Sequence, residues 1–162
     1  MRPDAFDAVA GLLVAAGVAA ALTPVTAMFA RRVGAVDHPR DRGLGPGGTP
    51  LLGGLAIYAG VVVGALLMLD IDDELLGILL GATLITFVGA LDDRFDLLPG
   101  AKLLGQIAAA AIPVAYGLTV DNVTIPFVGP VDFGWLGAPL TVLGLVAVMN
   151  IVNFSDGVDG LA

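Results

Sequence analysis

Residues 75–96 read LLGILLGATLITFVGALDDRFD, and the polarity of this stretch changes abruptly at one point. No charged residue occurs from Leu75 to Leu91, whereas four of the next five residues are charged. A helix of about 20 mainly apolar residues is long enough to cross the hydrocarbon core of a bilayer. The stretch therefore predicts a membrane-spanning helix that ends in an acidic cluster.

The composition of the whole chain agrees with that interpretation. Of its 162 residues, 57% are hydrophobic and only 14% are charged, whereas about 25% are charged in a typical soluble domain. The chain contains no Cys, which excludes disulfides and thiolate metal sites. Its net charge of -8 argues against nucleic acid as a partner, because phosphate binding needs a basic surface.

Apolar runs long enough for membrane helices recur along the chain. We predict an all-α polytopic membrane protein with about five transmembrane helices, forming a single membrane domain over residues 1–162. Residues 119–135 mix β-branched and aromatic side chains with Pro and Gly, which predicts a small extracytoplasmic β-hairpin on the membrane surface. The five runs are Val9–Ala30, Leu51–Leu69, Leu75–Leu91, Ala101–Leu118 and Gly137–Val152.

The basic residues indicate how the helices are oriented. Alternating the five runs across the membrane leaves Arg2 on one side and places the other six basic residues on the opposite side, which should be the cytoplasm. Those six are Arg31, Arg32, Arg40, Arg42, Arg94 and Lys102. We therefore expect the N-terminus outside and the polar segment at residues 153–162 on the cytoplasmic face.

Two of the runs carry glycines at helical spacing. Gly60 and Gly64 lie four residues apart, as do Gly77 and Gly81. Small residues at this spacing let helix backbones approach closely. We expect these glycines to be packing positions.

Asp92 and Asp93 are the first candidates for chemistry. Acidic residues where a membrane helix reaches the interface are energetically expensive and usually functional. Adjacent carboxylates can hold Mg²⁺ together with phosphate oxygens, or one can act as a base while the other stays ionised. Charged residues also gather where helices leave a bilayer, so a solvated interfacial loop remains an alternative.

A second polar group lies in the last run. Asn150, Asn153, Asp156 and Asp159 recur at every third residue, which would align them on one face of a helix that runs from the bilayer into the cytoplasm. A polar helix end that frays into solvent is the alternative. Lys102 and Gln106 form a polar pair four residues apart, which could reach a phosphate or simply pack.

Three segments together resemble a known family. They are GGTPLLGGLAIY at residues 47–58, GALDDRFDLLPGAKLLGQ at residues 89–106 and NIVNFSDGVDGLA at residues 150–162. The chain is similar in these segments to the polyprenyl-phosphate N-acetylhexosamine-1-phosphate transferases, which form glycosyltransferase family 4. The third segment is the most specific of the three, and the aspartate pair alone would be weak.

The resemblance implies a reaction and a site. A sugar-1-phosphate, most simply N-acetylglucosamine-1-phosphate, would pass from a UDP-sugar to polyprenyl phosphate with release of UMP, at the start of cell-envelope polysaccharide synthesis. Mg²⁺, with Mn²⁺ as an alternative, would be the cofactor. The implied catalytic residues are Asp92 and Asp93, the substrate-binding residues are Thr49, Lys102, Asn150, Asn153, Asp156 and Asp159, and the metal ligands are Asp92, Asp93, Asn153 and Asp156.

The resemblance also implies a setting for this site. The protein would be a multi-pass protein of the plasma membrane with its active face in the cytoplasm, in contact with the lipid bilayer, and a homodimer is compatible with it. We expect the chain to be the N-terminal half of a longer transferase and to be inactive alone. A transporter subunit, a CDP-alcohol phosphotransferase and a non-catalytic membrane fragment are the alternative functions.

Overall fold

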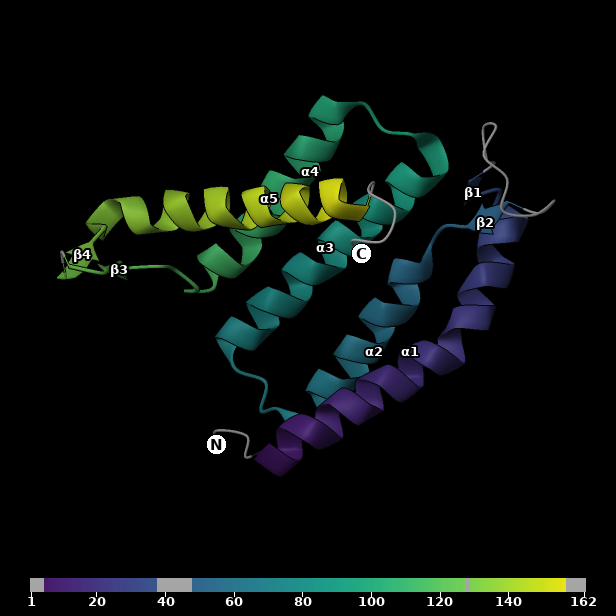
Figure 1. Ribbon diagram of the computed structural model, residues 1–162, viewed down its shortest axis with the longest axis horizontal. Helices are drawn as coiled ribbons and strands as arrows, with labels where there is room; N and C mark the ends of the chain where they lie inside the picture. Colours follow the sequence, from purple (N-terminus) through teal and green to yellow (C-terminus); the bar gives the residue numbers. More distant parts are fainter. Residues whose placement is uncertain (1–4, 38–47, 128, 157–162) are drawn as a thin grey trace. The chain divides into compact units, whose positions relative to one another are not determined.

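The computed structural model describes residues 5–37, 48–127 and 129–156. Among these residues, five α-helices lie on the five predicted apolar runs, which confirms the helical membrane fold (Figure 1). The elements are α1 (Ala5–Val33), β1 (Val36–Asp37), β2 (Thr49–Pro50), α2 (Gly53–Met68), α3 (Asp73–Phe95), α4 (Pro99–Ala115), β3 (Asn122–Ile125), β4 (Gly129–Asp132), the 3₁₀ helix η1 (Gly134–Leu136) and α5 (Gly137–Asp156).

Three of the helical segments are long and apolar enough to cross a membrane: Phe6–Val33, Asp73–Phe95 and Gly134–Phe154. Helix α2 is also apolar but has 16 residues. At about 1.5 Å per residue it rises about 24 Å, which is less than the usual hydrocarbon thickness of about 30 Å. The protein is a helical membrane protein, and a full count of five spans stays a prediction.

The chain divides into two compact units. The first contains Met1–Ile71 and Thr86–Leu98, and the second contains Asp72–Ile85 and Pro99–Ala162. Helix α3 contributes its second half to the first unit and its first half to the second. The single membrane domain over residues 1–162 therefore stays a prediction.

Helices α1 and α2 pack closely in the first unit (Figure 1). Gly60 and Gly64 of α2 are both buried, and a Cβ atom added at Gly60 would overlap the backbone oxygen of Ala15 on α1. At Gly64 the same added atom would lie 3.0 Å from the oxygen of Gly11. The predicted packing role of this glycine pair is confirmed.

The C-terminal end of α1 is joined to the start of α2 through a small buried cluster. Ala30, Ala35 and Leu52 are almost completely inaccessible. The Leu51 N–H donates to the Ala35 oxygen at 3.0 Å, next to the short antiparallel pair of β1 and β2. This cluster fixes the backbone immediately before α2, where one of the candidate site residues lies.

In the second unit, α3 packs against α4 through the other glycine pair. A Cβ atom at Gly77 would lie 2.5 Å from the Cβ of Tyr116, and one at Gly81 would lie 2.8 Å from the Ala109 oxygen. Both glycines are buried. Their predicted packing role is confirmed as well.

The predicted hairpin is also present. Strands β3 and β4 pair antiparallel, with Val123 opposite Val131. The hairpin is tied to α5 by the Thr141 hydroxyl, which accepts from the Val120 N–H at 2.8 Å and donates to the Gly137 oxygen at 2.8 Å. The side chains of Phe127 and Trp135 are largely exposed, and the extracytoplasmic position of the hairpin stays a prediction.

Candidate functional site

Asp92 lies in the last turn of α3 and holds the backbone that leaves this helix. Its main-chain oxygen accepts from the Asp96 N–H at 2.9 Å, and its carboxylate Oδ1 accepts from the Leu97 N–H at 3.2 Å. Asp96 has a φ of 51°, in the left-handed region where helices commonly end. Asp92 is therefore one cause of the sharp exit of the chain from α3.

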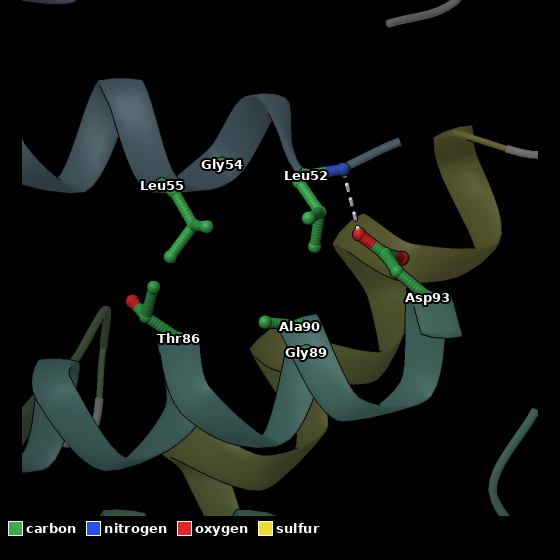
Figure 2. Close-up of a pocket in the computed structure, with 7 residues that line it drawn as sticks. All are labelled: Leu52, Gly54, Leu55, Thr86, Gly89, Ala90 and Asp93. Carbon is green, nitrogen blue, oxygen red and sulfur yellow. Dashed lines mark hydrogen bonds between the residues drawn. The ribbon is translucent and has the colours of Figure 1, made fainter. Parts of the chain in front are cut away.

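Asp93 reaches across to a different helix. Its Oδ2 accepts a hydrogen bond from the Leu52 N–H at 3.1 Å (Figure 2). Leu52 is the N-cap residue of α2, has a φ of 29°, and makes no capping bond with its own side chain. The carboxylate accepts one of the backbone N–H groups at the start of α2 that have no partner within the helix. Its negative charge is favourable at the positive end of the helix dipole.

A cavity of about 140 Å³ lies beside this contact. Figure 2 shows Leu55 of α2 and the N-cap residue Leu52 on one side and Thr86 and Ala90 of α3 on the other, with Asp93 at one end. The walls are mainly apolar, and the Asp93 carboxylate is the one charged group among the labelled residues. The cavity thus joins an apolar space to a charged hydrogen-bond acceptor.

The two carboxylates do not form a ready-made chelating pair. Neighbouring residues on a helix point about 100° apart and do not face each other, and here the two side chains bind different segments. Within residues 5–37, 48–127 and 129–156 there is no group of three His, Cys, Asp or Glu residues arranged to hold a metal ion. The pair provides carboxylate oxygens, which are suitable metal ligands, at the end of an apolar helix.

Thr49, the first predicted substrate-binding residue, lies near this contact along the chain. It is exposed in β2, where it pairs with Asp37 of β1. Because Leu52 follows it by three residues and is bound to Asp93, Thr49 belongs to the same end of the first unit. Its role in substrate binding stays a prediction.

The second unit brings together polar residues of α4 and α5. The Asn150 amide nitrogen donates to Gln106 Oε1 at 2.8 Å and to the Val146 oxygen at 2.8 Å. The Lys102 ammonium group donates to Asn153 Oδ1 at 3.4 Å. Three predicted site residues, Lys102, Asn150 and Asn153, therefore lie on one seam between two helices.

The remaining predicted residues receive no test. Asp156 ends α5, but its side chain lies outside the part that the structure describes, and Asp159 lies entirely outside it. Asp92 and Asp93 belong to the first unit and Asn153 to the second. A shared metal site of these residues therefore stays a prediction.

Two participants in these contacts were not assigned to the site from the sequence. One is the backbone N–H of Leu52, which the sequence could not indicate because every non-proline residue carries such a group. The other is Gln106, whose spacing from Lys102 was visible but fitted simple packing equally well. The sequence could not show that Gln106 accepts a hydrogen bond from Asn150 on α5.

Residues 75–162, just over half of the chain, match the model of glycosyl transferase family 4. The chain belongs to this family. The matched region includes Asp92 and Asp93 as well as the polar residues of α4 and α5.

Curated relatives match over most of this chain. A Bacillus subtilis protein named "Probable undecaprenyl-phosphate N-acetylglucosaminyl 1-phosphate transferase" is 38% identical over 87% of the chain and 40% of its own length. The decaprenyl-phosphate N-acetylglucosaminephosphotransferase of Mycobacterium leprae is 34% identical over 93% of the chain and 41% of its own length. The undecaprenyl-phosphate alpha-N-acetylglucosaminyl 1-phosphate transferase of Yersinia pestis is 34% identical over 85% and 38%. The chain thus spans about two fifths of the length of these relatives.

Proposed function

We propose that this chain carries part of the active site of a transferase that moves N-acetylglucosamine-1-phosphate from a UDP-sugar to polyprenyl phosphate. An oxygen of the lipid phosphate forms a bond to the β-phosphorus of the UDP-sugar. The bond from that phosphorus to the bridging oxygen breaks, and the oxygen leaves with UMP. The product is a polyprenyl diphosphate sugar, which would start the synthesis of a cell-envelope polysaccharide. The names of the three relatives support the acceptor and the transferred group.

The observation that carries the proposal is the aspartate pair at the end of α3. This helix is long and apolar enough to cross a membrane, and the family match covers the pair. Carboxylates at such a boundary are costly to place and usually functional. A lipid phosphate must be reached at this depth, because its prenyl chain stays in the bilayer.

The donor set of the pair suits Mg²⁺. This ion prefers oxygen ligands, keeps several waters and is often held by one or two carboxylates together with substrate phosphates. Diverging carboxylates without a third acidic partner among the described residues are compatible with such an open site. Asp92 and Asp93 would hold the ion, with Asn153 and Asp156 as further candidates and Mn²⁺ as an alternative ion. When bound, the ion would neutralise charge on the phosphates.

The chain's own polar groups would divide the remaining work. One of the two aspartates would accept the proton of the lipid phosphate, which makes its oxygen a better nucleophile. Lys102 and the amides of Asn150 and Asn153 would bind the phosphates and the nucleotide. They would act as hydrogen-bond donors that are already in position before the substrate binds. Thr49, Asp156 and Asp159 complete the proposed substrate-binding set. Phosphoryl transfer depends mostly on such positioning and charge stabilisation.

The proposed setting is the plasma membrane, crossed several times, with the active face in the cytoplasm. The guanidinium group of Arg94 lies beside Gly34, just after the basic end of α1. Basic residues therefore gather at one end of the first unit, as the positive-inside rule expects of a cytoplasmic end.

This topology can be tested by labelling. Because the chain has no Cys, single cysteines at Arg32 and Asp121 can be labelled in sealed vesicles. We expect labelling from opposite sides, and labelling from the same side would contradict this topology.

The activity is tested with two proteins. One is the 162-residue chain, and the other is a chimaera in which this chain replaces the matching segment of the Bacillus subtilis relative. With undecaprenyl phosphate, UDP-N-acetylglucosamine and Mg²⁺, we expect the chimaera to release UMP and the chain alone to release none. A folded, membrane-inserted chimaera without UMP release would instead support the non-catalytic alternative.

A further inference from the structure

Gln106 is a buried polar residue to which the proposed function assigns no role. It lies on α4 with an exposed fraction of only 3%, and its Oε1 accepts from the amide nitrogen of Asn150 on α5 at 2.8 Å. Burying an amide in an apolar environment is unfavourable unless it is hydrogen-bonded. A seam that required packing alone would be better served by an apolar residue, such as Ala109 and Ala110 on the same helix, which are also buried.

The contact with Gln106 fixes the orientation of the Asn150 side chain. An Asn amide group carries two N–H donors, and the Asn150 nitrogen uses two acceptors, Gln106 Oε1 and the Val146 oxygen, each at 2.8 Å. The second acceptor belongs to α5 itself, so it would be present whatever the position of α4. The bond to Gln106 is the one that relates Asn150 to the neighbouring helix.

A second contact along the same seam sets the rotation of α5. Lys102 lies four residues before Gln106 on α4, and its partner Asn153 lies three residues after Asn150 on α5. The two contacts run in opposite chain directions, as expected for antiparallel helices. Each residue turns a helix by about 100°, so a shift of α5 by one residue would break both contacts.

We propose that Gln106 is a positioning residue that fixes Asn150, and through it the polar face of α5, against α4. Its importance for the reaction rests on the proposed function, in which Asn150 and Asn153 bind the UDP-sugar. Gln106 would not touch the substrate. Its contribution is to hold the amide of Asn150 in one orientation before the substrate arrives, so that ordering this side chain does not weaken binding.

The positioning itself can be measured without any enzymatic activity. The chain contains three Asn and one Gln, so its side-chain amides give four resolvable signal pairs in a ¹⁵N spectrum, and those of Asn150 are assigned by their loss in Asn150→Asp. In the full 162-residue chain, we expect Gln106→Leu to accelerate solvent exchange of the Asn150 amide protons by about tenfold. The unfolding midpoint should move by no more than about 3 °C, because Leu fills a similar volume.

Two variants separate the hydrogen bond from packing. Gln106→Glu keeps an acceptor oxygen at the same reach, so the Asn150 exchange rate should stay within about twofold of the wild-type rate. Ile107→Leu changes a partly exposed apolar residue on the same helix and should leave the Asn150 signals unchanged. Unchanged Asn150 exchange in Gln106→Leu would overturn the proposal.

The consequence for binding is measured in the chimaera. Gln106→Leu should raise KM for UDP-N-acetylglucosamine about five- to tenfold, because an Asn150 amide that is no longer held in place would lose about one neutral hydrogen bond to the substrate. The kcat should change less than about twofold. Altered Asn150 exchange with an unchanged KM would overturn the role in binding and leave a purely structural contact. If the wild-type chimaera releases no UMP, the proposed function fails, and the exchange data alone decide whether Gln106 positions Asn150.

Discussion

Substitution of Asp93 separates two roles of the same carboxylate. In the structure this group accepts the Leu52 N–H at 3.1 Å and so caps α2. In the proposed reaction it also holds a metal ion or accepts a proton. Asp93→Asn keeps an acceptor oxygen but removes the charge, whereas Asp93→Ala removes both. The two variants therefore predict different combinations of stability and activity.

The expected stability changes follow from the capping contact. Loss of the hydrogen bond to the Leu52 N–H costs about 1 kcal/mol, whereas Asn in place of Asp93 still offers an acceptor oxygen. Loss of the charge at the helix N-terminus adds about 0.3–1 kcal/mol. With about 2–4 °C per kcal/mol for a chain of this size, Asp93→Ala should lower the unfolding midpoint by about 3–8 °C and Asp93→Asn by about 1–4 °C.

The expected loss of activity is much larger. A general base or a charge that acts in the transition state commonly contributes about 10²-fold or more to the rate, so both variants of the chimaera should release UMP at least about 10²-fold more slowly than the wild type. Unfolding is followed by the fluorescence of Trp135, the only Trp in the chain, and UMP release by a coupled phosphate assay. Near-normal UMP release in Asp93→Asn would refute the chemical role and leave Asp93 as a helix cap.

Three further outcomes are expected. Gly60→Ala should lower the unfolding free energy of the chain by about 1–3 kcal/mol in denaturant titrations, because the new Cβ overlaps the backbone of α1; an unchanged value would contradict the observed packing. Gly89→Ala is the matched control, since its Cβ would meet nothing within 4 Å. This variant should raise the unfolding free energy by about 0.5–1 kcal/mol, and a lower value would contradict the open space at this position. Trp135, which is 84% exposed next to α5, should be quenched by lipids brominated near the headgroup more than by lipids brominated at the chain ends, and the opposite order would place it away from the interface.

The arrangement of helices could be predicted from the sequence because the bilayer imposes one simple requirement. Runs of apolar residues must form helices when no water is available to bind the backbone, so the expected run Leu75–Leu91 became the centre of α3. Glycines four residues apart indicated close contacts for a different reason, because small residues on one face of a helix let a second backbone approach. Their partners, such as Ala15 and Tyr116, could not be named, because spacing within one helix carries no information about the helix opposite.

The position of Asp92 and Asp93 at a helix end was also predictable, but their contacts were not. Asp93 binds a backbone N–H that lies 41 residues earlier in the chain. Backbone groups have no sequence signature, and the unusual conformation of Leu52 at φ 29° is not one that a leucine suggests. Charged residues at membrane boundaries can thus be located from sequence, while the groups they hold depend on how two helix ends meet.

The polar contacts between α4 and α5 explain two spacings that were ambiguous in the sequence. Lys102 and Gln106 alone fit a snorkelling lysine and a packing glutamine, and Asn150 and Asn153 alone fit a frayed helix end. Antiparallel helices align a four-residue step on one with a three-residue step on the other, so each pair supplies the partners of the other. The Gln106–Asn150 bond joins two uncharged side chains. Such interhelical hydrogen bonds in membranes contribute only about 0.6 kcal/mol on average, so stability alone does not explain this contact. Both contacts exclude other rotations of α5, because an apolar seam could slip by one residue at little cost, whereas a slip of this one would break both interhelical hydrogen bonds at once.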